Sequence, residues 1–254
     1  LKGTVISMDE VLWQKENKKQ LPPWSYAITF DDGFENNYSV ASPILECHET
    51  PATFYVSTNL IDNNFMTWTD QIEFCLNNTK QAIVNLPWQN SYYHLSSESS
   101  KINCLKDIRY YLKKQPEIYD YEKIVDIIFE QCDTKIVISS NHPLDKKMSW
   151  DQVSKLHHNK LFTIGGHSHN HVSLGSIGST LMNNEIDISI KLLKDKVNIS
   201  SKHYSYPEGQ EIDFNESVID KLKSKDIKCC PSAIDGLNDL SLGSLFYLQR
   251  VMVN

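Results

Sequence analysis

Short apolar segments alternate with amphipathic segments along most of this chain of 254 residues, and the alternation limits the folds that it can adopt. Five short apolar runs bounded by turn residues are predicted to be strands: residues 26–30, 52–56, 161–164, 203–206 and 246–253. Between them, apolar side chains recur at helical spacing in residues 38–48, 149–157, 181–197 and 218–224. Strands that alternate with helices indicate an α/β fold, built either as a barrel or as an open sheet.

The middle of the chain, about residues 68–147, has a different pattern. Residues 102–114 and 121–132 have the spacing of amphipathic helices, and the strand signal is limited to the short run 135–138. We therefore expect a helical insertion within a single domain that spans residues 1–254.

Composition argues against several classes of protein. The formal net charge is −7 and no block of lysine or arginine stands out, which argues against binding to nucleic acid or to an anionic membrane surface. No run of about 18 apolar residues is present, so no transmembrane helix is predicted. The six cysteines are scattered without a C-x-x-C pair, which favours buried, reduced thiols.

These features favour a location in the cytoplasm or at the inner face of the membrane. The sequence begins with Leu1 and not with methionine, so we expect that an upstream segment has been removed. Secretion therefore stays an alternative location.

Three clusters of polar residues follow predicted strands. Asp31, Asp32 and Gly33 come after residues 26–30, the stretch His167-Ser-His-Asn-His171 comes after 161–164, and Tyr206-Pro-Glu-Gly209 ends the strand 203–206. The carboxyl ends of parallel strands meet at one edge of a sheet or barrel, where functional groups collect. We therefore expect these clusters to form one site.

The histidine cluster indicates a metal site. His167 and His171 are four positions apart and would share one face of a helix, whereas in an irregular turn His167 and His169 would converge instead. Imidazole nitrogen suits zinc and similar metals, and one carboxylate oxygen completes a three-ligand site with an open position for water. Zinc is the expected metal, with cobalt, nickel and manganese as alternatives.

The two adjacent aspartates supply two carboxylates with different tasks. Successive side chains of an extended chain point to opposite sides, so one of Asp31 and Asp32 can bind the metal while the other faces the rest of the pocket. A metal beside a free carboxylate fits metal-assisted hydrolysis. The metal lowers the pKa of its water toward about 7, and the carboxylate accepts the proton of that water.

The stretch Thr29-Phe-Asp-Asp-Gly33 and the histidine cluster resemble the T-F-D-D-G and H-[ST]-x-x-H motifs of the polysaccharide deacetylases of carbohydrate esterase family four. These proteins share the nodulation-type chitooligosaccharide deacetylase homology domain. The resemblance covers about residues 26–68 and 148–253. It implies a distorted (β/α)7-type barrel and the removal of acetyl groups from N-acetylated sugars.

The resemblance also implies roles for individual residues. The residues concerned are the general base Asp31, the metal ligands Asp32, His167 and His171, the oxyanion-binding backbone N–H of Tyr206, and the neighbouring substrate contact Pro207. His169 falls at a variable position and is interpreted as a solvated loop residue. Trp68, at the start of the insertion, offers a face on which a sugar could stack, although packing against the inserted helices is the preferred interpretation.

Two departures from the family pattern concern catalysis. The third motif normally reads R-x-x-Y-P, and here His203 stands where the arginine that supports the base is expected. His203 is therefore a candidate for that role, with Arg250 or Lys202 as alternatives. No histidine follows His203, although the family usually carries a general-acid histidine on a late strand. We expect the proton donor to lie on a segment upstream of Leu1.

The predicted function is metal-dependent hydrolysis of the N-acetyl group of a sugar in a cell-envelope or surface polysaccharide. The first alternative is an O-acetyl esterase on the same scaffold. The second is an inactive relative that binds carbohydrate, which the two departures suggest. The predicted partner is an N-acetylated sugar substrate.

Overall fold

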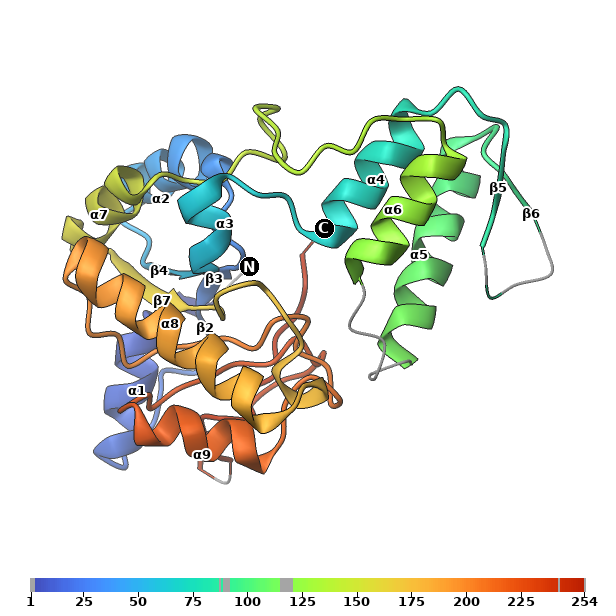
Figure 1. Cartoon of the computed structure of the whole chain (residues 1–254). Helices are drawn as coiled ribbons and strands as arrows, with labels where there is room; N and C mark the ends of the chain where they lie inside the picture. Colours follow the sequence, from blue (N-terminus) through green and yellow to red (C-terminus); the bar gives the residue numbers. More distant parts are fainter. Residues whose placement is uncertain (1–2, 87, 89–91, 115–120, 242, 254) are drawn as a thin grey trace. The chain divides into compact units, whose positions relative to one another are not determined.

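The computed structural model describes residues 3–86, 88, 92–114, 121–241 and 243–253. The chain divides into two compact units (Figure 1). The first contains residues 1–64 and 142–254, and the second contains residues 65–141.

A parallel sheet forms the centre of the first unit. Its three strands, in spatial order, are β3 (Ile28–Phe30), β4 (Ala52–Val56) and β7 (Phe162–Gly166). Single parallel bridges lie further along, joining Gly166 to Tyr204, His203 to Cys229, and Pro231 to Leu248. A separate parallel pair consists of β1 (Thr4–Val5) and β2 (Ser25–Tyr26).

The α/β fold predicted from the alternation is confirmed. The predicted strands 203–206 and 246–253 are reduced to single bridges, and the first of them ends at Pro207, which has no N–H to donate to a ladder. Among the residues described, the pairings form an open series from β3 to Leu248 and do not by themselves form a closed barrel. The barrel stays a prediction.

Six α-helices are described in the first unit: α1 (Met8–Glu16), α2 (Ser42–Cys47), α3 (Thr58–Asn63), α7 (Trp150–His158), α8 (Ser179–Val197) and α9 (Glu216–Ser224). A π-helical turn, Asn37–Ala41, leads into α2, and a 3-10 turn spans Leu174–Ser176. The helix α7 begins with a capping box at Ser149. Gln152 N–H donates to Ser149 Oγ, and Ser149 N–H donates to Gln152 Oε1.

Close packing around β7 fixes the end of the sheet that carries the candidate site. Phe54 stacks on Phe30 with ring centroids 5.0 Å apart and meets Phe162 edge-on at 5.3 Å. Gly165 and Gly166 end β7, and a Cβ at either position would lie 2.5 Å from a tyrosine ring. Only glycine allows these rings to approach so closely.

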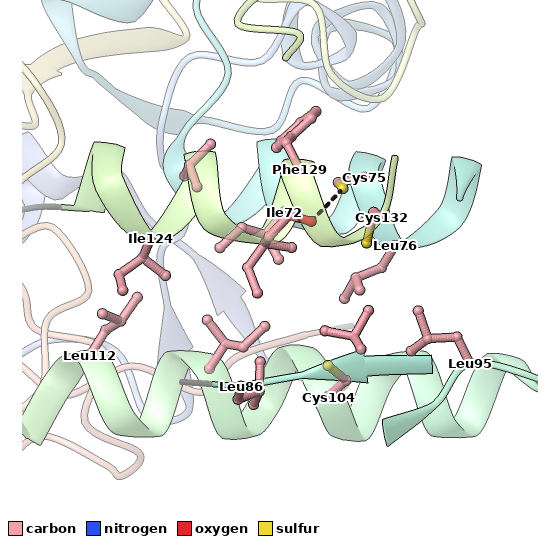
Figure 2. Close-up of a cluster of buried hydrophobic side chains, with 14 residues drawn as sticks. Ile72, Cys75, Leu76, Leu86, Leu95, Cys104, Leu112, Ile124, Phe129 and Cys132 are labelled. Atoms are coloured by element: carbon pink, nitrogen blue, oxygen red, sulfur yellow. Dashed lines mark hydrogen bonds between the residues drawn. The ribbon is translucent and has the colours of Figure 1, made fainter. Parts of the chain in front are cut away.

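The second unit has its own buried core (Figure 2), formed by α4 (Trp68–Asn78), α5 (Glu98–Lys114) and α6 (Tyr121–Gln131) with β5 (Ile83–Asn85) and β6 (Tyr92–His94). The two helices predicted for the insertion are confirmed. The strand signal at 135–138 does not give a strand, and the next residue, Ser139, makes a single bridge to Phe65. The antiparallel pair β5–β6 was not predicted, since its strands are short and largely exposed.

The cysteine and helix patterns agree with two further expectations. All six cysteines are free thiols, and only Cys47 is exposed. In the part of the chain that the structure describes, no helix combines the length and the hydropathy needed to cross a bilayer.

Candidate active site

Three side chains from two loops converge at the carboxyl ends of β3 and β7. Asp32 Oδ1 lies 3.2 Å from Nε2 of His167 and 3.0 Å from Nε2 of His171. One ligand atom from each of the three residues lies within 4.8 Å of the others, a spacing that suits one metal ion. Sequence reasoning therefore selected a set of residues that the fold does bring together.

The second ring nitrogen of His167 indicates which atom faces the metal position. His167 is buried, and its Nδ1–H donates to the carbonyl oxygen of Ser205 at 2.9 Å. A carbonyl oxygen only accepts hydrogen bonds, so in the neutral ring the proton is on Nδ1 and the lone pair of Nε2 faces Asp32. A contact of this kind, from outside the candidate ligands, would orient the imidazole toward a metal ion.

The Nε2 atoms of both imidazoles and Oδ1 of Asp32 face one another. Asp32 Oδ1 is buried and, within the described chain, accepts no hydrogen bond. Burial alone would raise the pKa of Asp32, but His171 and His167 outweigh it and hold that pKa well below its usual range. Such a set of donors fits a divalent cation, and the residues that would hold it are Asp32, His167 and His171.

The backbone that presents these ligands is irregular. Residues 167–171 are not helical, so the explanation that His167 and His171 share a helix face is wrong, although their convergence is confirmed. Instead, Ser168 and His171 adopt left-handed φ values of 57° and 55°. Asp32 is also left-handed, with φ 70°, so a turn rather than strand alternation separates its side chain from that of Asp31.

Asp31 is held by a guanidinium. Nη1 of Arg250 donates to Asp31 Oδ1 at 2.9 Å, and Nη2 donates to Oδ2 at 2.7 Å. The same guanidinium also donates to Thr29 Oγ1 and to the carbonyl of Ser232. Burial opposes the charge of Arg250, but the Asp31 carboxylate outweighs it and raises the pKa of Arg250. Of the three candidate supports for Asp31, Arg250 is the one that the structure places there.

His203 has a different partner. Its Nε2 donates to Oδ1 of Asp9, on α1, at 2.9 Å. Asp9 Oδ2 also accepts a hydrogen bond from Thr163 Oγ1. The prediction that His203 supports the base is therefore corrected, because its ring is buried against α1 and is engaged there.

Ser205 links Asp31 to His167, and sequence reasoning missed it. Its hydroxyl donates to Asp31 Oδ1 at 3.3 Å and lies 2.7 Å from Nδ1 of His167. Ser205 is fully buried, and in the sequence it lies between His203 and Tyr206. Its position directly before the third cluster was the available signal, although nothing in the sequence indicated which neighbours it contacts.

Tyr206 and Pro207 follow Ser205 and are both buried. The backbone N–H of Tyr206, to which the resemblance assigns oxyanion binding, makes a long hydrogen bond of 3.4 Å to the carbonyl of Pro231. Its phenol donates to the carbonyl of Phe246. The two buried side chains hold this segment in place.

The remaining predicted residues lie in separate surroundings. Trp68 begins α4 of the second unit and packs against the buried cluster of that unit, which agrees with the packing interpretation. His169 is not simply solvated, because its Nδ1 lies 2.8 Å from Oγ1 of Thr58 at the start of α3.

Comparison with known families gives one match. The family model for polysaccharide deacetylase matches residues 18–230, which is most of the chain and includes Asp31, Asp32, His167 and His171. No curated protein matches the sequence.

Several solved structures share the fold. The Streptococcus pyogenes deacetylase PplD in complex with acetate aligns over 99% of this chain and 74% of its own, with a TM-score of 0.60 and 15% identity. The deacetylase domain of BpsB from Bordetella bronchiseptica aligns over 98% and 78%, with a TM-score of 0.61 and 15% identity. IcaB from Ammonifex degensii aligns over 100% and 78%, with a TM-score of 0.61 and 13% identity.

Proposed function

The chain belongs to the polysaccharide deacetylase family, and from that premise we propose that it is a metal-dependent hydrolase of the N-acetyl group of a sugar. One observation carries the proposal. The convergent set formed by Asp32, His167 and His171 lies in the same site as a second carboxylate, Asp31, which Ser205 links to it and which an arginine holds by both oxygens. This arrangement supplies the two requirements of metal-assisted amide hydrolysis, a cation site and a positioned base.

The bound metal, for which zinc suits the ligand set best, would polarise the acetyl carbonyl and make water more acidic. Asp31 accepts a proton from that water as the water oxygen bonds to the acetyl carbon. The amide C–N bond then breaks as the nitrogen takes up the proton that Asp31 accepted, and the products are acetate and a free amino group on the sugar. The backbone near Tyr206 is the proposed donor to the oxyanion.

Arg250 positions Asp31 for this proton transfer. Because its two Nη atoms bind both carboxylate oxygens, the rotation of the Asp31 side chain is restricted. Ser205 restricts it further and also holds His167, so the base and the ligand set are linked through one residue. A general base must remain within hydrogen-bond reach of the water that it deprotonates.

The finer parts of the proposal are the barrel and the substrate. A barrel agrees with the parallel bridges beyond β7 and with the two contacts from Arg250 to Thr29 and Asp31, which connect the last bridged segment to β3 and its loop. The acetate in the PplD complex is the expected product of deacetylation. We propose an N-acetylated cell-envelope or surface polysaccharide as the substrate class.

Acetate release tests the proposed function. The purified chain, loaded with zinc or cobalt, is incubated with N-acetylglucosamine oligomers and in parallel with acetylxylan. Release from the oligomers alone supports the N-deacetylase, and release from acetylxylan alone would support the O-acetyl esterase. The Asp31→Asn variant should keep its metal and lose turnover, and an Asp32→Ala variant should lose the metal.

One of the two arguments for an inactive carbohydrate-binding protein no longer applies. That alternative rested on the replacement of the motif arginine by His203 and on the lack of a later histidine. Arg250 provides the guanidinium that His203 does not. Binding of chitooligosaccharide by metal-loaded protein without any acetate release would favour this alternative.

A further inference from the structure

The loop that carries both candidate histidine ligands is held by its backbone from two sides. On one side, the first turn of α3 donates to its carbonyls: Thr58 N–H to Ser168 O at 3.3 Å, and Asn59 N–H to His169 O at 2.9 Å. On the other side, the loop donates its own N–H groups to Glu185, which lies on α8. The central peptide groups are therefore fixed in orientation.

Glu185 uses both of its carboxylate oxygens on this loop. Oε2 accepts the N–H of His169 at 3.0 Å and the N–H of Asn170 at 2.8 Å, and Oε1 accepts from Asn170 Nδ2 at 2.6 Å. The residue is only 3% exposed. A carboxylate is buried at low cost only when hydrogen bonds replace its water, and the loop supplies three. The buried charge of Glu185 therefore stabilises the one loop conformation that provides these three hydrogen bonds.

This conformation is one that the loop would not maintain alone. Ser168 and His171 both have left-handed φ values, and such backbone costs of order 1 kcal/mol or more at each non-glycine residue. The two residues that bind Glu185 lie directly between His167 and His171. The contact with Glu185 at this position therefore determines the distance between the two imidazoles and the direction in which each one points.

We propose that Glu185 is a positioning residue that sets the geometry of the metal ligands His167 and His171 through the peptide groups between them. The inference rests on the proposed metal site. Its test, however, measures metal binding and not deacetylation.

The hydrogen bond from Asn170 Nδ2 to Glu185 Oε1 can be reversed by exchanging the amide and the carboxylate between the two positions. Asn170 Oδ1 accepts from Asn59 Nδ2 at 2.7 Å, so the Asn170 amide cannot turn over without losing that bond. The variant Glu185→Gln therefore places an amide donor against the Nδ2 donor of Asn170. The variant Asn170→Asp places a carboxylate against Glu185. The double variant reverses the direction of this one hydrogen bond, keeps the others, and has the net charge of the wild type.

The experiment measures the Zn²⁺ affinity of the full chain by competition with a chromophoric chelator, together with the visible absorption of the Co²⁺ form. Each single variant is expected to weaken Zn²⁺ binding about tenfold, within the range typical for partners of metal ligands. The double variant should return to within about threefold of the wild type and recover its Co²⁺ spectrum. Asp187→Asn, on the same helix but paired with Lys221 and Lys225, should leave both readouts unchanged.

Two other patterns would overturn the proposal. If Glu185 acted only through its charge, Asn170→Asp would tighten Zn²⁺ binding and the double variant would simply add the two effects. If Glu185 only stabilised the fold, the variants would melt at lower temperature with unchanged Zn²⁺ affinity and spectrum. A wild-type chain that binds no Zn²⁺ would reject the proposed metal-dependent function as well, whereas wild-type binding with unaffected variants would reject only the role of Glu185.

Discussion

The ion pair between Arg250 and Asp31 makes a prediction whose size follows from the structure. Arg250 makes four hydrogen bonds, two of them to the carboxylate, and the two side chains are 13% and 25% exposed. Removing one partner of a buried ion pair costs about 3–5 kcal/mol. Because both groups retain some contact with water, Arg250→Met should cost about 3 kcal/mol, at the lower end of that range.

This cost has a thermal and a kinetic consequence. At roughly 2–4 °C per kcal/mol for a chain of this size, the melting temperature should fall by about 6–12 °C. The Asp31 carboxylate would also lose its fixed orientation, and a misplaced catalytic group can reduce a rate by about 100-fold. We therefore expect kcat for acetate release to fall by about two orders of magnitude while the Zn²⁺ content stays at the wild-type level. Arg250→Lys should be intermediate, since an ammonium keeps the charge but not the two-pronged contact.

Calorimetry, elemental analysis and acetate release together check this prediction. The control is Arg109→Met, at the other arginine of the chain, on α5 of the second unit. That control should keep kcat. The reasoning would be refuted by an Arg250→Met protein that melts near the wild-type temperature and turns over at the wild-type rate. An equal loss of kcat in the Arg109 control would show that the effect is not specific to the base.

Three further predictions concern neighbouring contacts. Ser205→Ala removes a neutral hydroxyl worth about 1 kcal/mol, so kcat should fall about fivefold with metal content unchanged, as measured by acetate release and elemental analysis. Gly166→Ala forces a methyl group to within 2.5 Å of a tyrosine ring and should cost about 1–3 kcal/mol in urea unfolding, whereas Gly178→Ala meets nothing within 4 Å and should cost far less. The hydrogen bond from His203 lowers the pKa of Asp9, so its stabilising effect is present above about pH 4 and is lost as the pH falls through the lowered pKa. The stability difference between wild type and Asp9→Asn should thus be present at pH 6 and shrink toward pH 3 in urea unfolding.

The residues of the candidate site were predictable because their spacing is local. The motif at Asp31 and Asp32 and the two histidines of the second cluster each lie within a few positions of one another, directly after a strand. Where parallel strands end, such groups meet, and Asp32, His167 and His171 do converge. The path of the loop was not predictable, since its left-handed residues depend on contacts with α3 and α8.

The residues that hold the candidate site in place were predicted only in part, for a related physical reason. Arg250 and Asp31 are 219 positions apart, and the sequence alone left three candidates to support the base. His203 binds Asp9, 194 positions away, on a helix that the apolar pattern did not indicate. Long-range pairing of polar side chains depends on the tertiary fold, whereas apolar periodicity and short motifs are properties of the local chain.

The exchange of partners between His203 and Arg250 also explains how the family motif can change without loss of the ion pair. The resemblance places an arginine at the position of His203, yet the guanidinium at Asp31 comes from the segment that follows the Leu248 bridge. Both segments belong to the same series of parallel bridges, so either could direct a long side chain toward the end of β3. In this chain one guanidinium binds both oxygens of the carboxylate, and it comes from the segment of Arg250. A histidine at position 203 is then free to pair with Asp9 and to attach α1 to the sheet.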